Sequence, residues 1–167
     1  MLVLAIDPGN EQSGWVVYDT AYDREALICH QGVVSAGISP NEELLENMRH
    51  DDDIDQLVVE MIASYGMPVG REVFDTCVWI GRFWEAFPGP RDKVFRKDVK
   101  MCVCSDPRAK DSNIRQALID RFGPGRTAAI GTKKAPGPLY GFKRDMWAAL
   151  GVAVTWVEMG NGGGDAA

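Results

Sequence analysis

The sequence predicts an α/β fold in which helices flank one mixed β-sheet. Three apolar segments near the N-terminus are separated by short polar links, a pattern typical of antiparallel strands. Later, strand-like segments alternate with segments of helical spacing, which favours parallel strands covered by helices. The chain has 167 residues with no internal repeat and no long linker. We therefore expect one domain over residues 1–159 and a flexible tail over residues 160–167.

The first half of the chain contains most of the predicted strands. The turn after the first strand holds Pro8, Gly9 and Gly14, and the next link, Asp19–Arg24, is short enough for a hairpin. We expect strands at Leu2–Ile6, Trp15–Tyr18, Ala26–Val34 and Gln56–Ile62, with a helix at Asn41–Met48.

The second half contains most of the predicted helices. Residues 71–86 and Ala109–Phe122 place apolar side chains at helical spacing, and Gly123, Pro124 and Gly125 end the second of these helices. We also expect short strands at Lys93–Phe95 and Met101–Cys104, a loop rich in lysine, proline and glycine at Gly131–Gly141, and a closing helix at Asp145–Val157.

Composition narrows the class of protein. A content of 46% hydrophobic residues with five tryptophans is typical of a globular chain. The N-terminus has no basic segment before its apolar residues, and no apolar run approaches the roughly 20 residues that span a bilayer, so we expect neither a signal peptide nor a membrane anchor. The four cysteines form no CxxC pair. We expect reduced thiols, no zinc site and a cytoplasmic protein.

Charge is divided unevenly along the chain. Residues 1–90 carry 16 acidic and 4 basic side chains, whereas residues 91–144 carry 14 basic and 5 acidic ones. A basic block within an acidic chain predicts a phosphate-binding face, with solvated helix surfaces as the alternative. The candidates for phosphate contact are Arg96, Lys97, Arg108, Arg115, Lys133, Lys134, Lys143 and Arg144.

Three acidic residues occupy positions suited to a metal site. Asp7 follows the first strand, Glu60 lies near the end of a later strand, and Asp145 opens the last helix. Ligands of open α/β sheets bind beyond the carboxyl ends of strands, and crowded carboxylates need a cation such as Mg²⁺ or Mn²⁺. Two such ions would support phosphodiester hydrolysis. Alternatively, Asp7 forms a turn, Glu60 is a surface acid and Asp145 caps a helix.

Four segments together resemble the RuvC group of Holliday junction resolvases, within the RNase H-like or retroviral-integrase superfamily. LAIDPGNEQSGW is similar to the first-strand motif of that group, and VVEMIASYGMPVGREVFDTCVWIGRF to its strand, acid and following helix. FRKDVKMCVCSDPRAKDSNIRQAL resembles its lysine-bearing strand and next helix, and DMWAALGVAV its terminal acidic helix. The IGTKKAPGPLYG stretch looks closest to phage-encoded members.

The resemblance implies an RNase H-like endonuclease that acts in DNA recombination and repair, in a bacterial or phage-infected cell. It implies a homodimer that binds four-way DNA junctions and nicks two strands symmetrically with Mg²⁺ or Mn²⁺, two ions per site. By position, Asp7, Glu60 and Asp145 would be metal ligands, and Lys100 and Lys110 would lie near the scissile phosphate.

One departure from the family pattern concerns the last helix. Members present a ligand pair spaced by three residues, but the positions three residues from Asp145 are Phe142 and Ala148, and neither binds a metal. Asp111 is the nearest replacement, although a charge at a helix N-terminus explains it more simply. The missing ligand motivates an alternative function, a junction-binding protein with weak or no cleavage.

The aromatic residues support two further expectations. Tyr65 follows Glu60 in a loop, where it could wedge against junction bases. The apolar segment from Phe74 to Trp84 has helical spacing, so we expect it in the core or in a dimer interface.

Two other functions fit parts of the sequence. An actin-like ATPase or sugar kinase also ends its first strand in Asp-x-Gly, but that architecture requires more residues than this chain has. A nuclease for RNA–DNA hybrids or forks would use the same fold, because the fold does not determine the substrate.

Overall fold

One five-stranded mixed sheet organises the molecule. A computed structural model describes residues 1–22, 32–63, 66 and 68–161. The strands are β1 (Leu2–Asp7), β2 (Gln12–Asp19), β3 (Val33–Pro40), β4 (Gln56–Met61) and β5 (Arg91–Phe95). They lie in the order β3-β2-β1-β4-β5, with β1, β2 and β3 antiparallel and β4 and β5 parallel to β1. The predicted order of antiparallel strands followed by parallel ones is therefore confirmed.

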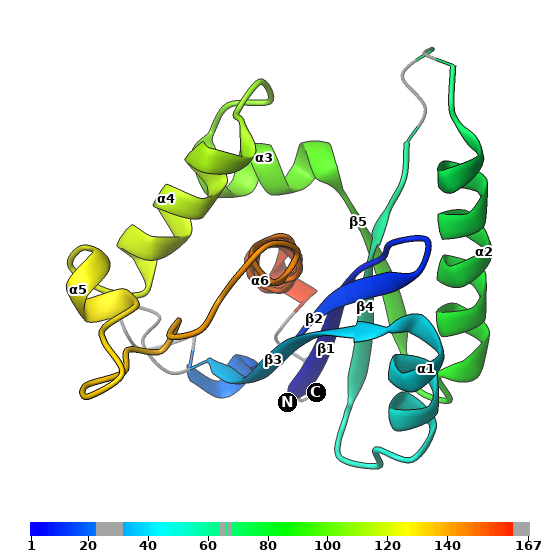
Figure 1. Cartoon of the computed structure of the whole chain (residues 1–167), viewed down its shortest axis with the longest axis horizontal. Helices are drawn as coiled ribbons and strands as arrows, with labels where there is room; N and C mark the ends of the chain where they lie inside the picture. Colours follow the sequence, from blue (N-terminus) through cyan, green and yellow to red (C-terminus); the bar gives the residue numbers. More distant parts are fainter. Residues whose placement is uncertain (23–31, 64–65, 67, 162–167) are drawn as a thin grey trace.

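Helices cover both faces of the sheet (Figure 1). They are α1 (Asn41–Arg49), α2 (Arg71–Ala86), α3 (Arg96–Cys104), α4 (Asp111–Arg121), α5 (Arg126–Ala129) and α6 (Met146–Trp156), with short helical segments at Thr20–Tyr22 and Val157–Asn161. Helices α1 and α2 pack on one face, while α6 packs on the other beneath α3 and α4. No helix among the described residues is long and apolar enough to cross a membrane.

The alternation of side chains along β1 builds two separate cores. Val3 and Ala5 point to the face that α6 covers, and Leu4 and Ile6 point to the face that α1 and α2 cover. Because both faces of the strand are buried, β1 is apolar at every position before its final acid.

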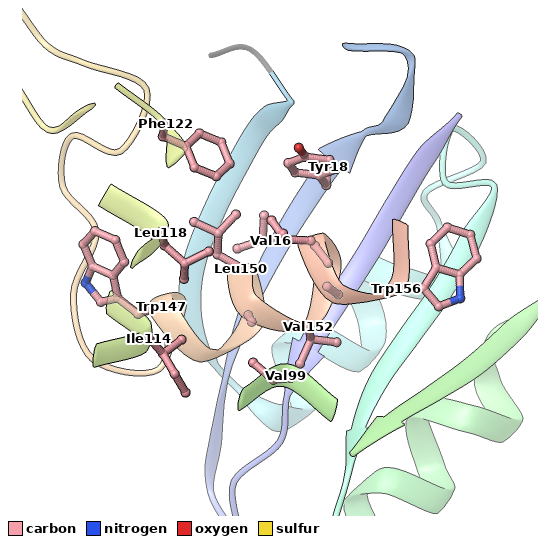
Figure 2. Packing of buried hydrophobic residues seen from close by; sticks show 14 of the residues in the cluster. Val16, Tyr18, Val99, Ile114, Leu118, Phe122, Trp147, Leu150, Val152 and Trp156 are labelled. Carbon is pink, nitrogen blue, oxygen red and sulfur yellow. The ribbon is translucent and has the colours of Figure 1, made fainter. Parts of the chain in front are cut away.

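Helix α6 is buried on all sides. Every residue from Met146 to Trp156 except Ala148 is buried, because the sheet lies below the helix and α3 and α4 lie above it. Figure 2 shows Leu150 and Val152 of α6 among side chains from β2, α3 and α4. A helix that is apolar around its whole circumference is typical of such an enclosed position. The start of α6 is therefore fixed relative to the sheet.

One predicted strand was wrong, and another lies mostly outside the described residues. Met101–Cys104 belongs to α3, in which Val99 is buried and Val103 packs against the same core four residues later, a helical rather than an extended spacing. The Asp98 side chain also accepts a hydrogen bond from the backbone N–H of Phe95, at 3.3 Å, which favours a helix start. The third strand runs over Val33–Pro40, and most of the predicted Ala26–Val34 lies outside the described residues.

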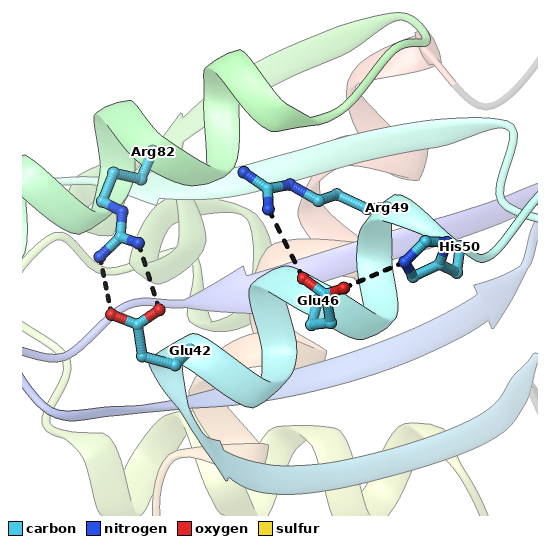
Figure 3. Close-up of polar contacts among 5 residues, drawn as sticks. All are labelled: Glu42, Glu46, Arg49, His50 and Arg82. Carbon is cyan, nitrogen blue, oxygen red and sulfur yellow. Dashed lines mark hydrogen bonds and ion pairs between the residues drawn. The ribbon is translucent and has the colours of Figure 1, made fainter.

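The outer helices also interact through exposed ion pairs. Arg82 of α2 donates two hydrogen bonds to Glu42 of α1, at 3.1 and 3.2 Å, and Glu46 pairs with Arg49 and His50 (Figure 3). Exposed pairs contribute about 1 kcal/mol or less each. Burial of apolar side chains such as Leu45 and Phe83 therefore supplies most of the stability of this layer.

Gly14 allows α6 to begin close to the sheet. A Cβ built on Gly14 would lie 2.5 Å from the backbone C and O atoms of Asp145, the residue just before α6. Real Cβ atoms do not approach backbone this closely, so any other residue would displace the start of α6.

We expect Gly14→Ala to lower the free energy of unfolding by about 1–3 kcal/mol, the usual cost of inserting a group into a packed site. Urea denaturation measures this change. Gly70→Ala is the matched control, because a Cβ there meets nothing within 4 Å, and its cost at a helix N-cap should be less than about 1 kcal/mol. Equal losses in the two variants would contradict the close approach.

Candidate active site

Two acidic side chains meet where neighbouring parallel strands end. Asp7 is the last residue of β1 and Glu60 is next to last in β4, and the strand register pairs Ile6 with Val59. This register brings the two carboxyl groups together, and their side chains form a hydrogen bond. The carboxyl end of parallel strands, where ligands of α/β proteins bind, thus presents an acid pair.

A buried polar network fixes the turn that follows Asp7. The Ser13 hydroxyl donates to the Asn41 side-chain oxygen at 2.7 Å, and it accepts a hydrogen bond from the Gly9 N–H at 3.2 Å. The Asn41 amide in turn donates to the Gly9 carbonyl at 2.9 Å. These contacts join the turn to the start of α1. They hold the backbone beside Asp7 in one conformation.

The third acid, Asp145, reaches the same site from the start of α6. Asp7 pairs with Gly14 across β1 and β2, and Gly14 touches the backbone of Asp145. Asp145 is therefore held near Asp7, and its charge acts on the Asp7 carboxyl. The preceding residue, Arg144, has a φ of 43°, which L-residues rarely adopt.

Burial makes the acid pair difficult to ionise. Burial, followed by the charges of Glu60 and Asp145, raises the pKa of Asp7 from 3.8 to about 8. Burial also raises the pKa of Glu60, although the Arg96 guanidinium opposes this shift. At neutral pH the pair therefore retains a proton when no cation is bound.

Arg96 is the positive side chain that contacts the acid pair. It is the first residue of α3, directly after β5, the parallel neighbour of β4. Its Nη1 lies 3.5 Å from both carboxylate oxygens of Glu60, and its Nη2 lies 2.5 Å from Oδ1 of Asp111 at the start of α4. Arg96 therefore links the acid pair to α4.

The acids line a pocket of about 870 Å³ that four arginines also line. Arg96, Arg115, Arg126 and Arg144 all line it, together with Trp147. The Arg115 guanidinium stacks 4.9 Å from the centre of the Trp147 ring. A phosphate group fits this combination, because arginine pairs with phosphate oxygens through two hydrogen bonds.

The pocket contains some of the sequence-predicted residues and leaves others outside. Asp7, Glu60, Asp145, Arg96, Arg115 and Arg144 line it. Lys97, Lys100, Arg108, Lys110, Lys133, Lys134 and Lys143 do not. Tyr65 lies outside the described residues.

Neither of the two lysines that match the family pattern lines the pocket. Lys100 lies on helix α3 and not on a strand, and Lys110 is the exposed residue before α4. Arg96, expected only as a DNA contact, is the cation beside the acids. Lys133 and Lys134 are exposed in a small turn, closed by the bridge between Gly131 and Pro136.

Sequence reasoning missed three residues that build the site. Asn41 was expected only as a helix start, and Gly14 only as part of a turn. Arg126 was counted in the basic block without being selected. Asp111 was named as the nearest replacement for a missing ligand, with a helix-terminal charge as the simpler explanation, and in the structure it pairs with Arg96. For Arg126 the glycine and proline before it were a signal for a new short helix, α5, which places its side chain at the pocket.

The donor set fits a hard cation held by few protein ligands. Asp7 and Glu60 supply adjacent carboxylates, and Mg²⁺ is commonly bound by one or two carboxylates plus substrate phosphates. No group of three or more His, Cys, Asp or Glu in the described part of the chain is close enough to hold a metal by itself. Phe142, three residues before Asp145, packs edge-on against Trp147 with ring centres 5.3 Å apart. Position 142 therefore makes an apolar contact and offers no metal ligand.

Comparison with known proteins shows the fold. No protein-family model matches the sequence, and no curated protein matches it. Among solved structures, Thermus thermophilus RuvC matches over 96% of this chain and 98% of its own, with a TM-score of 0.58 and 18% identity. T. thermophilus RuvC in complex with a Holliday junction substrate matches over 96% of this chain and 97% of its own, with a TM-score of 0.60 and 16% identity. This chain thus has the RNase H-like fold seen in RuvC, a Holliday junction resolvase.

Proposed function

We propose that this protein is a metal-dependent endonuclease that resolves four-way DNA junctions. The observation that carries the proposal is the acid pair of Asp7 and Glu60, with Asp145 beside it, in a pocket that four arginines also line. The RuvC-like fold supports branched DNA as the substrate.

In this proposal the acids and the arginines have separate roles. Asp7 and Glu60 would hold one Mg²⁺ or Mn²⁺ ion, and Asp145 with a substrate phosphate would supply ligands for a second. Such ions activate a water molecule and stabilise the leaving oxygen of a phosphodiester. Arg115, Arg126 and Arg144 would bind phosphates of the strand to be cut, while exposed lysines such as Lys133 and Lys134 would contact more distant phosphates.

A junction-binding protein with little cleavage is the second candidate. The absence of a three-ligand group among the described residues and the apolar Phe142 favour it. Both candidates require preferential binding of branched DNA, and only the first requires hydrolysis.

We expect Asp7→Asn to abolish nicking of a synthetic four-way junction while leaving its binding in EDTA intact. Losing a metal ligand removes several kcal/mol of transition-state stabilisation, so cleavage should fall at least about 100-fold. Gel-resolved cleavage of four-way, forked and linear DNA with Mg²⁺ and with Mn²⁺ measures this effect. Glu46→Gln, an exposed acid of α1, is the matched control.

The outcomes of this experiment distinguish the two candidate functions. Junction binding without cleavage in either metal would favour the second candidate. Equal affinity for linear and four-way DNA would contradict both.

In EDTA, we expect the protein to become less stable as pH rises from about 4 to about 8. The folded state holds a proton on Asp7 until about pH 8, whereas the unfolded chain releases it near the ordinary pKa of 3.8. The folded state thus binds more protons in this window, and stability present below pH 4 is lost as pH rises through the folded pKa. Each unit of pKa difference corresponds to about 1.4 kcal/mol.

Thermal unfolding across this pH range measures the slope. Asp7→Asn should flatten it, and Asp52→Asn, an exposed acid, should not. Mn²⁺ should restore stability at the alkaline end in the native protein and in Asp52→Asn, but not in Asp7→Asn. Identical slopes for the native protein and Asp7→Asn would contradict the burial of this charge.

We also propose that the protein is a homodimer joined through α2. Phe74 and Val78 lie four residues apart on one side of α2, and each is 61% exposed. Gly81 continues this side, and a Cβ there would meet no atom within 4 Å. An exposed apolar stripe suits a symmetric contact with a second copy.

We expect Val78→Glu to shift the protein from dimer to monomer, because the interface would then bury an unpaired charge. The dimer dissociation constant, measured by sedimentation equilibrium, should rise about tenfold or more. Val34→Glu is the control, since Val34 is 58% exposed on the edge strand β3. A native protein that sediments as a monomer at all concentrations would contradict the dimer.

A further inference from the structure

Arg96 lies where the acid pair is open to the pocket. The large pocket and a second cavity of about 240 Å³ both have Asp7, Glu60 and Arg96 in their linings. The Arg96 side chain is 30% exposed, so most of it is shielded from solvent at the place where the two cavities meet. It is therefore the cation that offsets the acids when no ion is present.

The two contacts of Arg96 differ in length. Its Nη2 is 2.5 Å from Asp111, whose side chain is 82% exposed, whereas its Nη1 is 3.5 Å from each oxygen of Glu60. The contact with Glu60 is longer than an ordinary charged hydrogen bond, which measures about 2.7–2.9 Å. Arg96 is thus anchored at Asp111 and more loosely held at Glu60.

We propose that Arg96 couples metal binding to DNA binding by occupying the place beside Glu60 that a metal ion would take. This inference rests on the proposed nuclease function. An ion that arrives alone must displace the guanidinium, and a carboxylate pair with its own cation attracts a second cation less strongly.

DNA removes this competition. A phosphate in the arginine-lined pocket offers Arg96 a bidentate partner in place of Glu60. Glu60 is then released to the metal while Arg96 remains linked to Asp111. By thermodynamic linkage, the ion strengthens DNA binding by the same factor. The ion would therefore be held tightly only when a strand is in place.

The experiment measures Mn²⁺ affinity, from the EPR signal of free Mn²⁺, with and without a four-way junction. Phosphorothioate linkages around the branch slow hydrolysis during the measurement. For the native protein we expect the junction to tighten Mn²⁺ binding about tenfold, within the usual range of coupling between sites. For Arg96→Gln we expect Mn²⁺ binding without DNA to be about tenfold tighter than in the native protein, and the junction to tighten it by a clearly smaller factor than in the native protein, because only direct phosphate ligation remains.

Two variants complete the design. Arg49→Gln makes the same change at an exposed ion pair of α1 and should behave as the native protein does. Arg96→Lys keeps a charge but loses the planar fork, so its Mn²⁺ affinity without DNA should lie between those of the native protein and Arg96→Gln. It also provides the test if Arg96→Gln does not fold. Removing Arg96 also makes the acids harder to ionise, so affinities are compared on the alkaline plateau of the affinity–pH curve.

The inference is overturned if the native protein and the Arg96 variants bind Mn²⁺ equally without DNA. It is also overturned if the junction tightens Mn²⁺ binding equally in all of them. A native protein that nicks junctions while giving either result would refute the coupling and leave the nuclease function intact. A native protein that shows the coupling but never nicks would refute the nuclease function alone.

Discussion

The repulsion between Asp7 and Glu60 is the constraint around which this molecule is organised. Parallel pairing of β1 with β4 forces two largely buried carboxyl groups together at the edge of the pocket. Such a pair is unfavourable unless it holds a proton or faces a cation. Arg96 supplies part of the compensation, and the rest is left for a proton or a ligand. A protein that served only its own stability would gain by replacing either acid with an apolar residue.

Rigid elements surround this unfavourable pair on each side. The network of Ser13, Asn41 and Gly9 fixes the turn after β1, and the enclosed helix α6 fixes Asp145. The arginines of the pocket wall come instead from α3, α4, α5 and the segment before α6. The acids thus belong to the sheet and its most buried helix, while most of the cations belong to the outer layer. This division separates the site that would hold ions from the surface that would hold DNA.

Patterns local in sequence were predicted well, whereas among contacts between distant segments only the meeting of the three acids was predicted. The apolar run of β1 predicted a strand that is buried on both faces. The helical spacing in α2 and α4 predicted those helices, because burial of one helix face demands that spacing. The strand predicted at Met101–Cys104 was wrong because a short apolar run is compatible with a strand or a helix. Packing of Val99 against α6 favours the helix, and this contact is not visible in the sequence. Arg96 contacts Glu60, and Gly14 contacts Asp145, only because particular strands become neighbours. The order of strands in the sheet is known only from the structure.

The separation of the acids along the chain also has a kinetic meaning. Asp7 and Glu60 come from strands separated by a hairpin and α1, and Asp145 comes from the last helix. Contacts between distant segments form slowly, because closing a long loop costs entropy before any contact repays it. A chain still emerging from the ribosome can complete its first hairpin with Asp7 in position, but it lacks the helix that carries Asp145. The costly charge cluster is therefore assembled only when most of the core exists to hold it.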